Sequence, residues 1–189
     1  PIQEHANQRV VAFTARQLSI TPEDDRSREA KYINSPKTPL FNKSSILFGL
    51  HKAKKEVSEE LPFILVEGQL DAIRCWTIGL PAIAPQGTSI TENQLLLLKR
   101  FSEKVICLLD GDEAGKKAAL RALPLAWKAG LDFQFYALPE GIDPDDMIID
   151  KGDVFSDLVV KDAVSALPFV VNSLLPDLRS ADAREKNRA

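Results

Sequence analysis

The pattern of hydrophobic and polar positions changes near residue 61. From there on, short apolar runs alternate with longer segments whose apolar residues recur at helical spacing. This rhythm predicts alternating strands and helices, which is typical of βαβ units around a parallel sheet. The predicted strands span residues 63–66, 81–84, 105–109 and 133–138, and the predicted helices between them span residues 69–79, 92–102 and 113–129.

The first 60 residues follow a different pattern. Residues 9–18 are rich in strand-favouring side chains, and with a short strand at residues 1–3 they predict a hairpin that feeds an antiparallel sheet. Residues 31–43 contain prolines that forbid a continuous helix, so an irregular loop is predicted there. Apolar positions at helical spacing predict a helix at residues 44–58.

Composition narrows the class of protein. With 44% hydrophobic and 27% charged residues, the 189-residue chain is typical of a soluble globular protein. No apolar run approaches the roughly 20 residues that span a bilayer, and no signal peptide opens the chain, so we expect a cytoplasmic protein without a membrane partner. Cys75 and Cys107 lie in apolar surroundings without zinc-finger spacing, which predicts buried reduced thiols and no zinc.

The net charge of -3 conceals a gradient along the chain. Residues 1–56 carry 10 Lys and Arg against 6 Asp and Glu, whereas residues 57–189 carry 14 against 21. A mildly basic first part joined to an acidic remainder suits a protein that holds a polyanion beside bound cations. Uneven solvated surfaces explain the same imbalance, so charge alone does not decide the function.

The most informative stretch reads V-I-C-L-L-D-G-D-E-A-G, at residues 105–115. Its apolar half predicts a buried strand, and Asp110 and Asp112 follow at the carboxyl end, where open α/β sheets bind ligands. Gly111 between them is expected to adopt a backbone conformation that is closed to other residues. Two readings stay open for this turn alone: the aspartates cap the next helix, or they bind a cation, with Mg²⁺ as the natural candidate.

Two further acidic turns follow predicted strands. Glu67 and Asp71 come after the first strand, and Asp143 and Asp145 come after the fourth. Because the carboxyl ends of parallel strands lie at one edge of a sheet, these turns are expected to converge with the one at Asp110. Converging carboxylates repel one another in a low dielectric, so bound cations are the economical explanation. The three turns together predict a metal site.

The loop at residues 31–43 suits the binding of a nucleic acid or a nucleotide. It interleaves lysines with Tyr32, Phe41 and the amide of Asn34. Lysines contact phosphates, and an aromatic ring offers a stacking face for a base. A surface loop anchored by its two aromatic residues explains the same stretch, so both readings stay open at this point.

These motifs carry a family resemblance. The segments E-G-Q-L-D, D-G-D-E-A-G and D-P-D-D resemble the Toprim signature of primases, topoisomerases and some nucleases. More narrowly, R-V-V-A-F, K-Y-I-N-S-P-K-T-P-L-F-N-K, Q-G-T-S-I-T and L-P-E-G-I-D-P-D-D follow in the order seen in bacterial replicative DNA primases of the DnaG type. The chain departs from that pattern at Thr14 and Ala15, which replace two glycines, at Gln69, which replaces a tyrosine, and at Asn42, which replaces a histidine.

The resemblance implies a fold and a division of the chain. The expected class is an α/β Toprim fold, an open, mainly parallel four-stranded sheet flanked by helices, with an N-terminal α+β segment and the start of a C-terminal helical subdomain. Residues 1–60 would belong to the N-terminal subdomain of the primase polymerase core, residues 61–152 to the Toprim domain, and residues 153–189 to a truncated helical subdomain. The chain would then be the central part of a longer protein.

The resemblance also implies roles for individual residues. The expected catalytic residues are Glu67, Asp110 and Asp112. The expected metal ligands are Glu67, Asp71, Asp110, Asp112, Asp143 and Asp145. The expected contacts to nucleic acid or nucleotide are Arg9, Lys31, Tyr32, Asn34 and Lys43. Whether Glu67 acts as a metal ligand or as a general base stays open.

The activity that the resemblance implies is synthesis of short RNA primers for DNA replication. Ribonucleoside triphosphates would be joined on a single-stranded DNA template by nucleotidyl transfer that depends on Mg²⁺, for which Mn²⁺ can substitute. A replicative helicase would bind through a domain absent from this chain, and whether this piece is active alone stays open. The alternatives are a Toprim nuclease or topoisomerase, which would cut a phosphodiester with the same carboxylates, and a non-catalytic module that binds metal and nucleotide.

Overall fold

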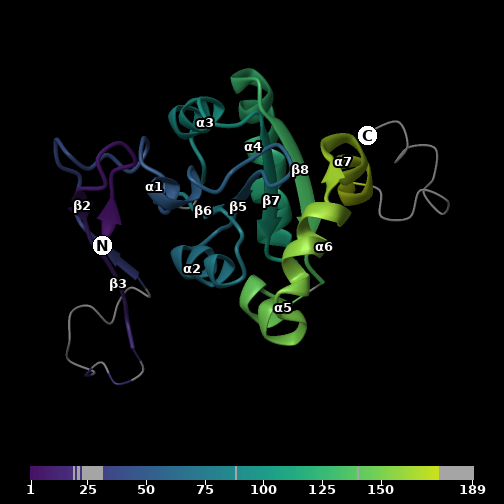
Figure 1. Cartoon of the computed structure of the whole chain (residues 1–189), viewed down its shortest axis with the longest axis horizontal. Helices are drawn as coiled ribbons and strands as arrows, with labels where there is room; N and C mark the ends of the chain where they lie inside the picture. The colour runs from purple at the N-terminus through teal and green to yellow at the C-terminus, as the bar shows by residue number, and fades with distance from the viewer. Residues whose placement is uncertain (19, 21, 23–31, 88, 140, 175–189) are drawn as a thin grey trace.

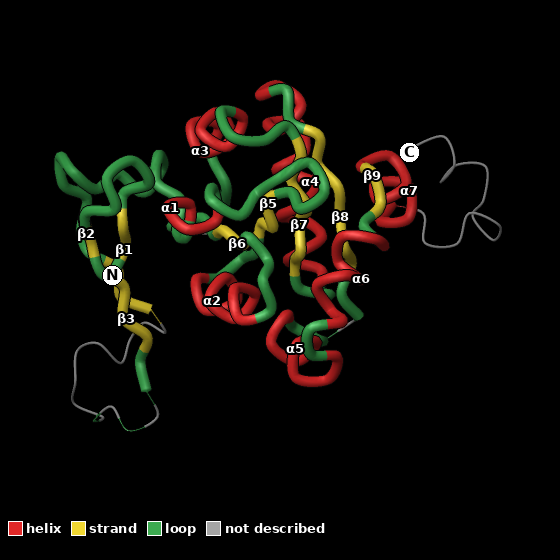
Figure 2. Tube along the Cα trace, viewed as in Figure 1, coloured by secondary structure: helices red, strands yellow, loops and turns green. Residues whose placement is uncertain are grey.

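A five-stranded sheet lies at the centre of the molecule, with helices on both sides (Figures 1 and 2). The computed structural model describes residues 1–18, 20, 22, 32–87, 89–139 and 141–174. Within these residues the strand order is β6-β5-β7-β8-β9. The strands are β5 (Phe63–Leu65), β6 (Ala82–Ile83), β7 (Lys104–Leu109), β8 (Asp132–Ala137) and β9 (Val164–Ser165).

The four predicted parallel strands are confirmed. β5 pairs in parallel with β6 and with β7, and β7 pairs in parallel with β8. The sheet also contains β9, which was not predicted and which runs antiparallel to β8 at the edge. Two residues are too few to produce a recognisable alternation, so the pattern could not have revealed this strand.

Seven helices lie in the described part of the chain. They are α1 (Leu50–Ala53), α2 (Gln69–Thr77), α3 (Glu92–Lys99), α4 (Glu113–Ala129), α5 (Pro144–Lys151), α6 (Val154–Asp162) and α7 (Ala166–Leu174). The predicted limits of α4 are confirmed, because Asp112 caps its first turn and Gly130 ends it in the left-handed conformation. None of these helices is long and apolar enough to cross a membrane.

Alternate side chains of the central strands face opposite layers of helices. Phe63 and Leu65 of β5 join one hydrophobic cluster with residues of α1, α3, α4 and α7. Ile64, between them, joins a second cluster with residues of α2, α5 and α6 and of the N-terminal strands. The strands are therefore covered on both faces, as their continuous apolar runs require (Figure 1).

The N-terminal part forms two small antiparallel pairs. β1 (Ile2–Gln3) pairs with β2 (Val10–Ala12), which confirms the predicted hairpin. β3 (Thr14–Arg16) pairs with β4 (Tyr32–Asn34), so the prediction of a wholly irregular loop at residues 31–43 is wrong at its start. The pairing partner decides this segment, because β4 forms only against β3. Lys31 lies outside the described residues.

The helix predicted at residues 44–58 is wrong in its extent. Only α1 is α-helical there, although the predicted apolar positions Leu47, Leu50 and Ala53 are buried. Phe48 forms an isolated antiparallel bridge with Ala84, and Gly49 follows with a φ of 81°. A tertiary contact thus holds the chain extended where local periodicity favours a helix.

Both cysteines are free and buried, as predicted. Burial raises the pKa of the Cys75 thiol to about 12 and also raises that of Cys107. At pH 8 the reactive thiolate is therefore scarce in the folded protein. We expect neither thiol to react with Ellman's reagent within minutes at pH 8, and both to react in denaturant. Rapid reaction of the folded protein would contradict this burial.

Candidate active site at the carboxyl edge of the sheet

The acidic turns after β5, β7 and β8 meet at one edge of the sheet. These strands are parallel neighbours, so their carboxyl ends lie side by side. Glu67 follows β5, and its Oε1 lies 3.4 Å from the backbone nitrogen of Asp110, which donates a hydrogen bond from the turn after β7. The predicted convergence of the first two turns therefore exists as a direct contact.

Gly111 brings the third turn into contact with the second. A Cβ atom at this position would lie 2.1 Å from the carbonyl oxygen of Pro139 and 2.6 Å from that of Leu138. The expected reason for a glycine here was wrong, because Gly111 is not among the residues with positive φ. This position must lack a side chain because the two loops approach each other closely, and not because the backbone adopts an unusual conformation.

Glu67 lies in an environment that opposes its charge. Burial raises the pKa of its carboxyl above the usual value, and the nearby carboxylates of Asp110, Asp112 and Asp71 raise it further. The hydrogen bond from the Asp110 backbone acts in the opposite direction. A bound cation would relieve this repulsion, so the donor set fits a hard divalent metal such as Mg²⁺.

Local hydrogen bonds hold two of the carboxylates near Glu67, those of Asp112 and Asp71. The Asp112 Oδ1 atom accepts a hydrogen bond of 2.7 Å from the backbone of Gly115, as a helix cap does. The Asp71 Oδ2 atom accepts one of 3.0 Å from the backbone of Gly68. The prediction that the aspartates cap the next helix is therefore confirmed for Asp112. The capping bond uses only the Oδ1 atom of its carboxylate.

The two predicted ligands after β8 bind other partners. Asp143 caps α5, because its Oδ1 accepts a hydrogen bond of 2.9 Å from the backbone of Asp146. Asp145 forms an ion pair with Arg74 of α2. In the described part of the chain, no three His, Cys, Asp or Glu side chains are grouped so that they could hold a metal ion. The carboxylates are held by local donors and not in a common coordination shell.

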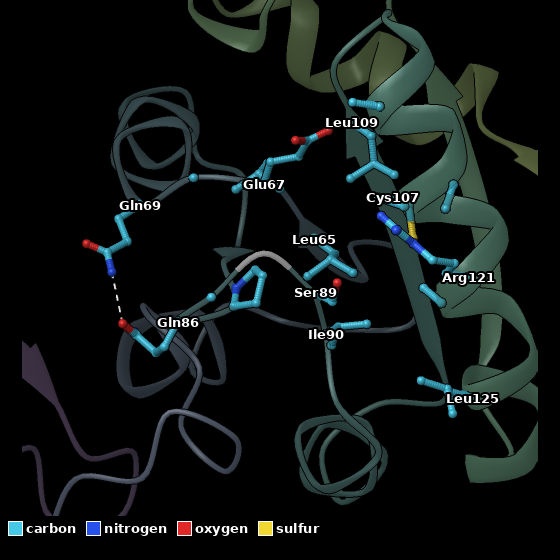
Figure 3. A pocket seen from close by; sticks show the side chains of 18 of the residues that line it. Leu65, Glu67, Gln69, Gln86, Ser89, Ile90, Cys107, Leu109, Arg121 and Leu125 are labelled. Carbon is cyan, nitrogen blue, oxygen red and sulfur yellow. Dashed lines mark hydrogen bonds between the residues drawn. The ribbon is translucent and has the colours of Figure 1, made fainter. Parts of the chain in front are cut away.

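A cavity of about 670 Å³ opens beside Glu67. It lies between the loops after β5 and β6 and one face of α4 (Figure 3), and residues of the strands β3 and β4 also line it. Its volume falls within the range of about 300–1,000 Å³ that is typical of small-molecule sites. Tyr32 and Asn34 line it, so two of the predicted nucleotide contacts share a cavity with the predicted catalytic glutamate. Arg9 and Lys43 do not line it.

Five polar residues of this cavity were not predicted as site residues, among them Gln69 and Ser89. Thr14 comes from β3, Gln86 from the loop after β6, and Arg121 from α4. The sequence could have indicated the position of Arg121, because the residues of α4 that line the cavity recur at helical spacing and so share one face. They are Ala114, Ala118, Ala119, Arg121, Ala122 and Leu125. Thr14 and Gln86 carried none, because long-range pairing brings them to the cavity.

Comparison with known proteins identifies two family matches. The Toprim-like family matches residues 64–148. The N-terminal domain of the DNA primase catalytic core matches residues 1–54. The first match contains the acidic turns, and the second contains β3 and β4. Both walls of the cavity therefore belong to segments with recognised relatives.

Relatives of the whole chain agree with these matches. A DNA primase of Aquifex aeolicus is 44% identical over 145 residues, which are 76% of this chain and 28% of the relative. The crystal structure of the zinc-binding and RNA polymerase domains of the Aquifex aeolicus primase is 37% identical, with a TM-score of 0.82, over 100% of this chain and 44% of that one. A structure of the DnaG primase catalytic domain bound to single-stranded DNA is 33% identical, with a TM-score of 0.81, over 100% of this chain and 58% of that one.

The chain spans less than a third of the length of the curated relatives that it matches. The structural matches confirm the predicted α/β Toprim fold, with the added edge strand β9. They also confirm the predicted family. The chain belongs to the DNA primases of the DnaG type, of whose catalytic core it carries the N-terminal and Toprim-like segments.

Proposed function

We propose that this chain carries the centre at which short RNA primers are made on single-stranded DNA from ribonucleoside triphosphates. One observation carries the proposal: Glu67 lies both at the acidic edge of the sheet and in the wall of a nucleotide-sized cavity. A cation held by the first feature and a nucleotide held by the second would meet at this side chain. Transfer of a nucleotidyl group needs that juxtaposition.

The DNA template is supported by a relative. A DnaG primase catalytic domain that is 33% identical binds single-stranded DNA, and its structure matches the whole of this chain. We assign Arg9 and Lys43, which do not line the cavity, to contacts with the template backbone, because cations contact phosphates without reading sequence. Lys31, outside the described residues, is assigned the same role. Contact with a replicative helicase is assigned to segments that this chain does not contain.

The cation is assigned to Mg²⁺, held mainly by Glu67, Asp110 and Asp112, whose side chains would have to move together because they are not grouped as metal ligands in this structure. Mn²⁺ has the same preference for oxygen ligands and is expected to substitute. Asp71, Asp143 and Asp145 would complete the acidic surroundings, once a cation competes with the local donors that now hold them. When bound, the metal favours the deprotonated form of the attacking hydroxyl and neutralises charge on the pyrophosphate leaving group.

The residues of the chain bind and orient the substrates. The raised pKa of Glu67 brings its carboxyl closer to the range in which a general base accepts a proton, so either role of this residue fits. Tyr32 offers a ring for stacking a base, and Asn34 offers an amide for hydrogen bonds. Arg121 presents a guanidinium group to the same cavity, where it would contact phosphate oxygens.

The test is incubation of the native protein that contains this chain with single-stranded DNA, ribonucleoside triphosphates and Mg²⁺. Short RNA products that disappear when the metal is chelated would support the proposal. Cleaved DNA would support a Toprim nuclease instead, and nucleotide binding without either product would support a non-catalytic module. Crystals soaked with Mn²⁺ would identify the metal ligands from anomalous scattering, and peaks away from Glu67 and Asp110 would contradict the assignment.

A further inference from the structure

The cavity concentrates polar atoms that have no hydrogen-bond partner. Within the described residues, five buried side-chain nitrogen or oxygen atoms lack a partner, and four of them belong to residues that line this cavity. The four atoms are Thr14 Oγ1, Asn34 Oδ1, Gln69 Oε1 and Gln86 Nε2. Buried polar groups are normally satisfied, so each exception calls for an explanation. Four exceptions around one cavity indicate a surface that completes its hydrogen bonds with a polar ligand.

Two of these atoms belong to a pair of side-chain amides. Gln69 Nε2 donates a hydrogen bond of 2.9 Å to Gln86 Oε1, as the dashed line in Figure 3 marks. Gln86 is 3% exposed, so its amide is held inside the wall of the cavity. Reversing both amides would reverse the bond, but the pair would still leave one acceptor and one donor unused. The number of unused groups therefore does not depend on how the amides are oriented.

A single hydroxyl group satisfies both unused groups, because it donates to the acceptor and accepts from the donor. We propose that the Gln69–Gln86 pair binds the 2′-hydroxyl of the incoming nucleotide and thereby selects ribonucleotides over deoxyribonucleotides. The inference rests on the proposed function, whose substrate it specifies. Both free atoms are buried in this structure, so the two side chains must shift together to admit the hydroxyl.

Position along the chain favours the sugar over the base. Gln69 is two residues from Glu67, so their Cα atoms are at most about 7 Å apart. The phosphorus that reacts must lie near Glu67, and the ribose is bonded directly to that phosphate through its 5′ oxygen. The base lies one group further away, where Tyr32 offers a stacking face. A donor and an acceptor near Glu67 are therefore placed for the sugar.

The test compares ribonucleotides with deoxyribonucleotides as substrates for the native protein. The ratio of their kcat/KM values is measured for wild type, Gln69→Leu, and the double variant Gln69→Leu/Gln86→Leu. We expect this ratio to fall at least about tenfold in both variants, through slower use of ribonucleotides and unchanged use of deoxyribonucleotides. Gln134→Leu, which changes a half-buried glutamine of β8 outside this cavity, is the control and is expected to leave the ratio unchanged.

Folding and specificity are separated by two further measurements. The double variant removes both partners of the amide bond at once, which leaves no orphaned partner and preserves the fold. Gln69→Asn keeps an amide but shortens its reach, and we expect it to lose discrimination and to melt below the double variant, because Gln86 Oε1 loses its donor. An unchanged ratio in these variants, or a change only in the preference among the four bases, would overturn the inference. Absence of RNA synthesis by the wild type would instead overturn the proposed function, and the inference with it.

Discussion

Replacing Glu67 by glutamine in the native protein is expected to lower the rate of primer synthesis at least about 100-fold. Glutamine preserves the size of the side chain, and its oxygen can still accept the hydrogen bond from the Asp110 backbone. Only the negative charge is lost, and with it a ligand for the cation or a base for the attacking hydroxyl. The measurement is incorporation of labelled ribonucleotides on a single-stranded template at saturating Mg²⁺.

Glu103→Gln is the matched control. Glu103 lies just before β7, at the opposite edge of the sheet, where it is exposed and forms an ion pair of 2.8 Å with Lys99. Loss of such an exposed pair has little effect on stability and none on the distant site, so the rate is expected to stay within about twofold of wild type. If Glu67→Gln retained more than half of the wild-type rate, the assignment of the active site would be wrong.

The Glu67→Gln substitution is expected to stabilise the metal-free protein. Because the pKa of Glu67 is raised in the folded state, its charge destabilises the fold above that pKa, and protonation removes the penalty as the pH falls through it. Glutamine carries no charge at any pH. We therefore expect the melting temperature of Glu67→Gln in EDTA to exceed that of wild type by about 1–2 °C at pH 8, and the difference to vanish toward acidic pH. A lower melting temperature at pH 8 would contradict the electrostatic account.

The sequence predicted correctly those helices and strands whose limits are set by residues nearby in the sequence. α4 begins and ends where Asp112 and Gly130 place its caps, and both signals lie within one turn of the helix. The apolar run of β7 likewise needs only its own residues to be recognised. The segment at residues 44–58 fails for the complementary reason, since the bridge between Phe48 and Ala84 overrides its helical periodicity.

The candidate site was likewise predictable only in part. Parallel strands made the meeting of Glu67 and Asp110 predictable, because topology alone brings strand ends to one edge. The ion pair between Asp145 and Arg74 depends on the packing of α2 against α5, which the local sequence does not specify. The polar wall of the cavity was likewise hidden, because Thr14 and Gln86 come from strands and loops far apart in the chain.

Gly111→Ala is expected to lower the melting temperature by about 3–10 °C and to reduce primer synthesis in the fraction that stays folded. A methyl group at this position would lie 2.1 Å from the Pro139 carbonyl oxygen, so one of the two loops must move. Movement of the turn after β7 displaces Asp110 and Asp112, on either side of the glycine. Stability and activity are therefore expected to fall together, which thermal denaturation and the primer assay measure.

Gly87→Ala is the control, since a Cβ there meets no atom within 4 Å and this glycine has no positive φ. Its melting temperature is expected to stay within about 1–2 °C of wild type. Gly111→Asn separates the two explanations for the glycine. Asparagine tolerates the left-handed conformation, so it would retain stability better than alanine if backbone conformation were the requirement. Because close approach to Pro139 is the requirement, we expect Gly111→Asn to be at least as unstable as Gly111→Ala.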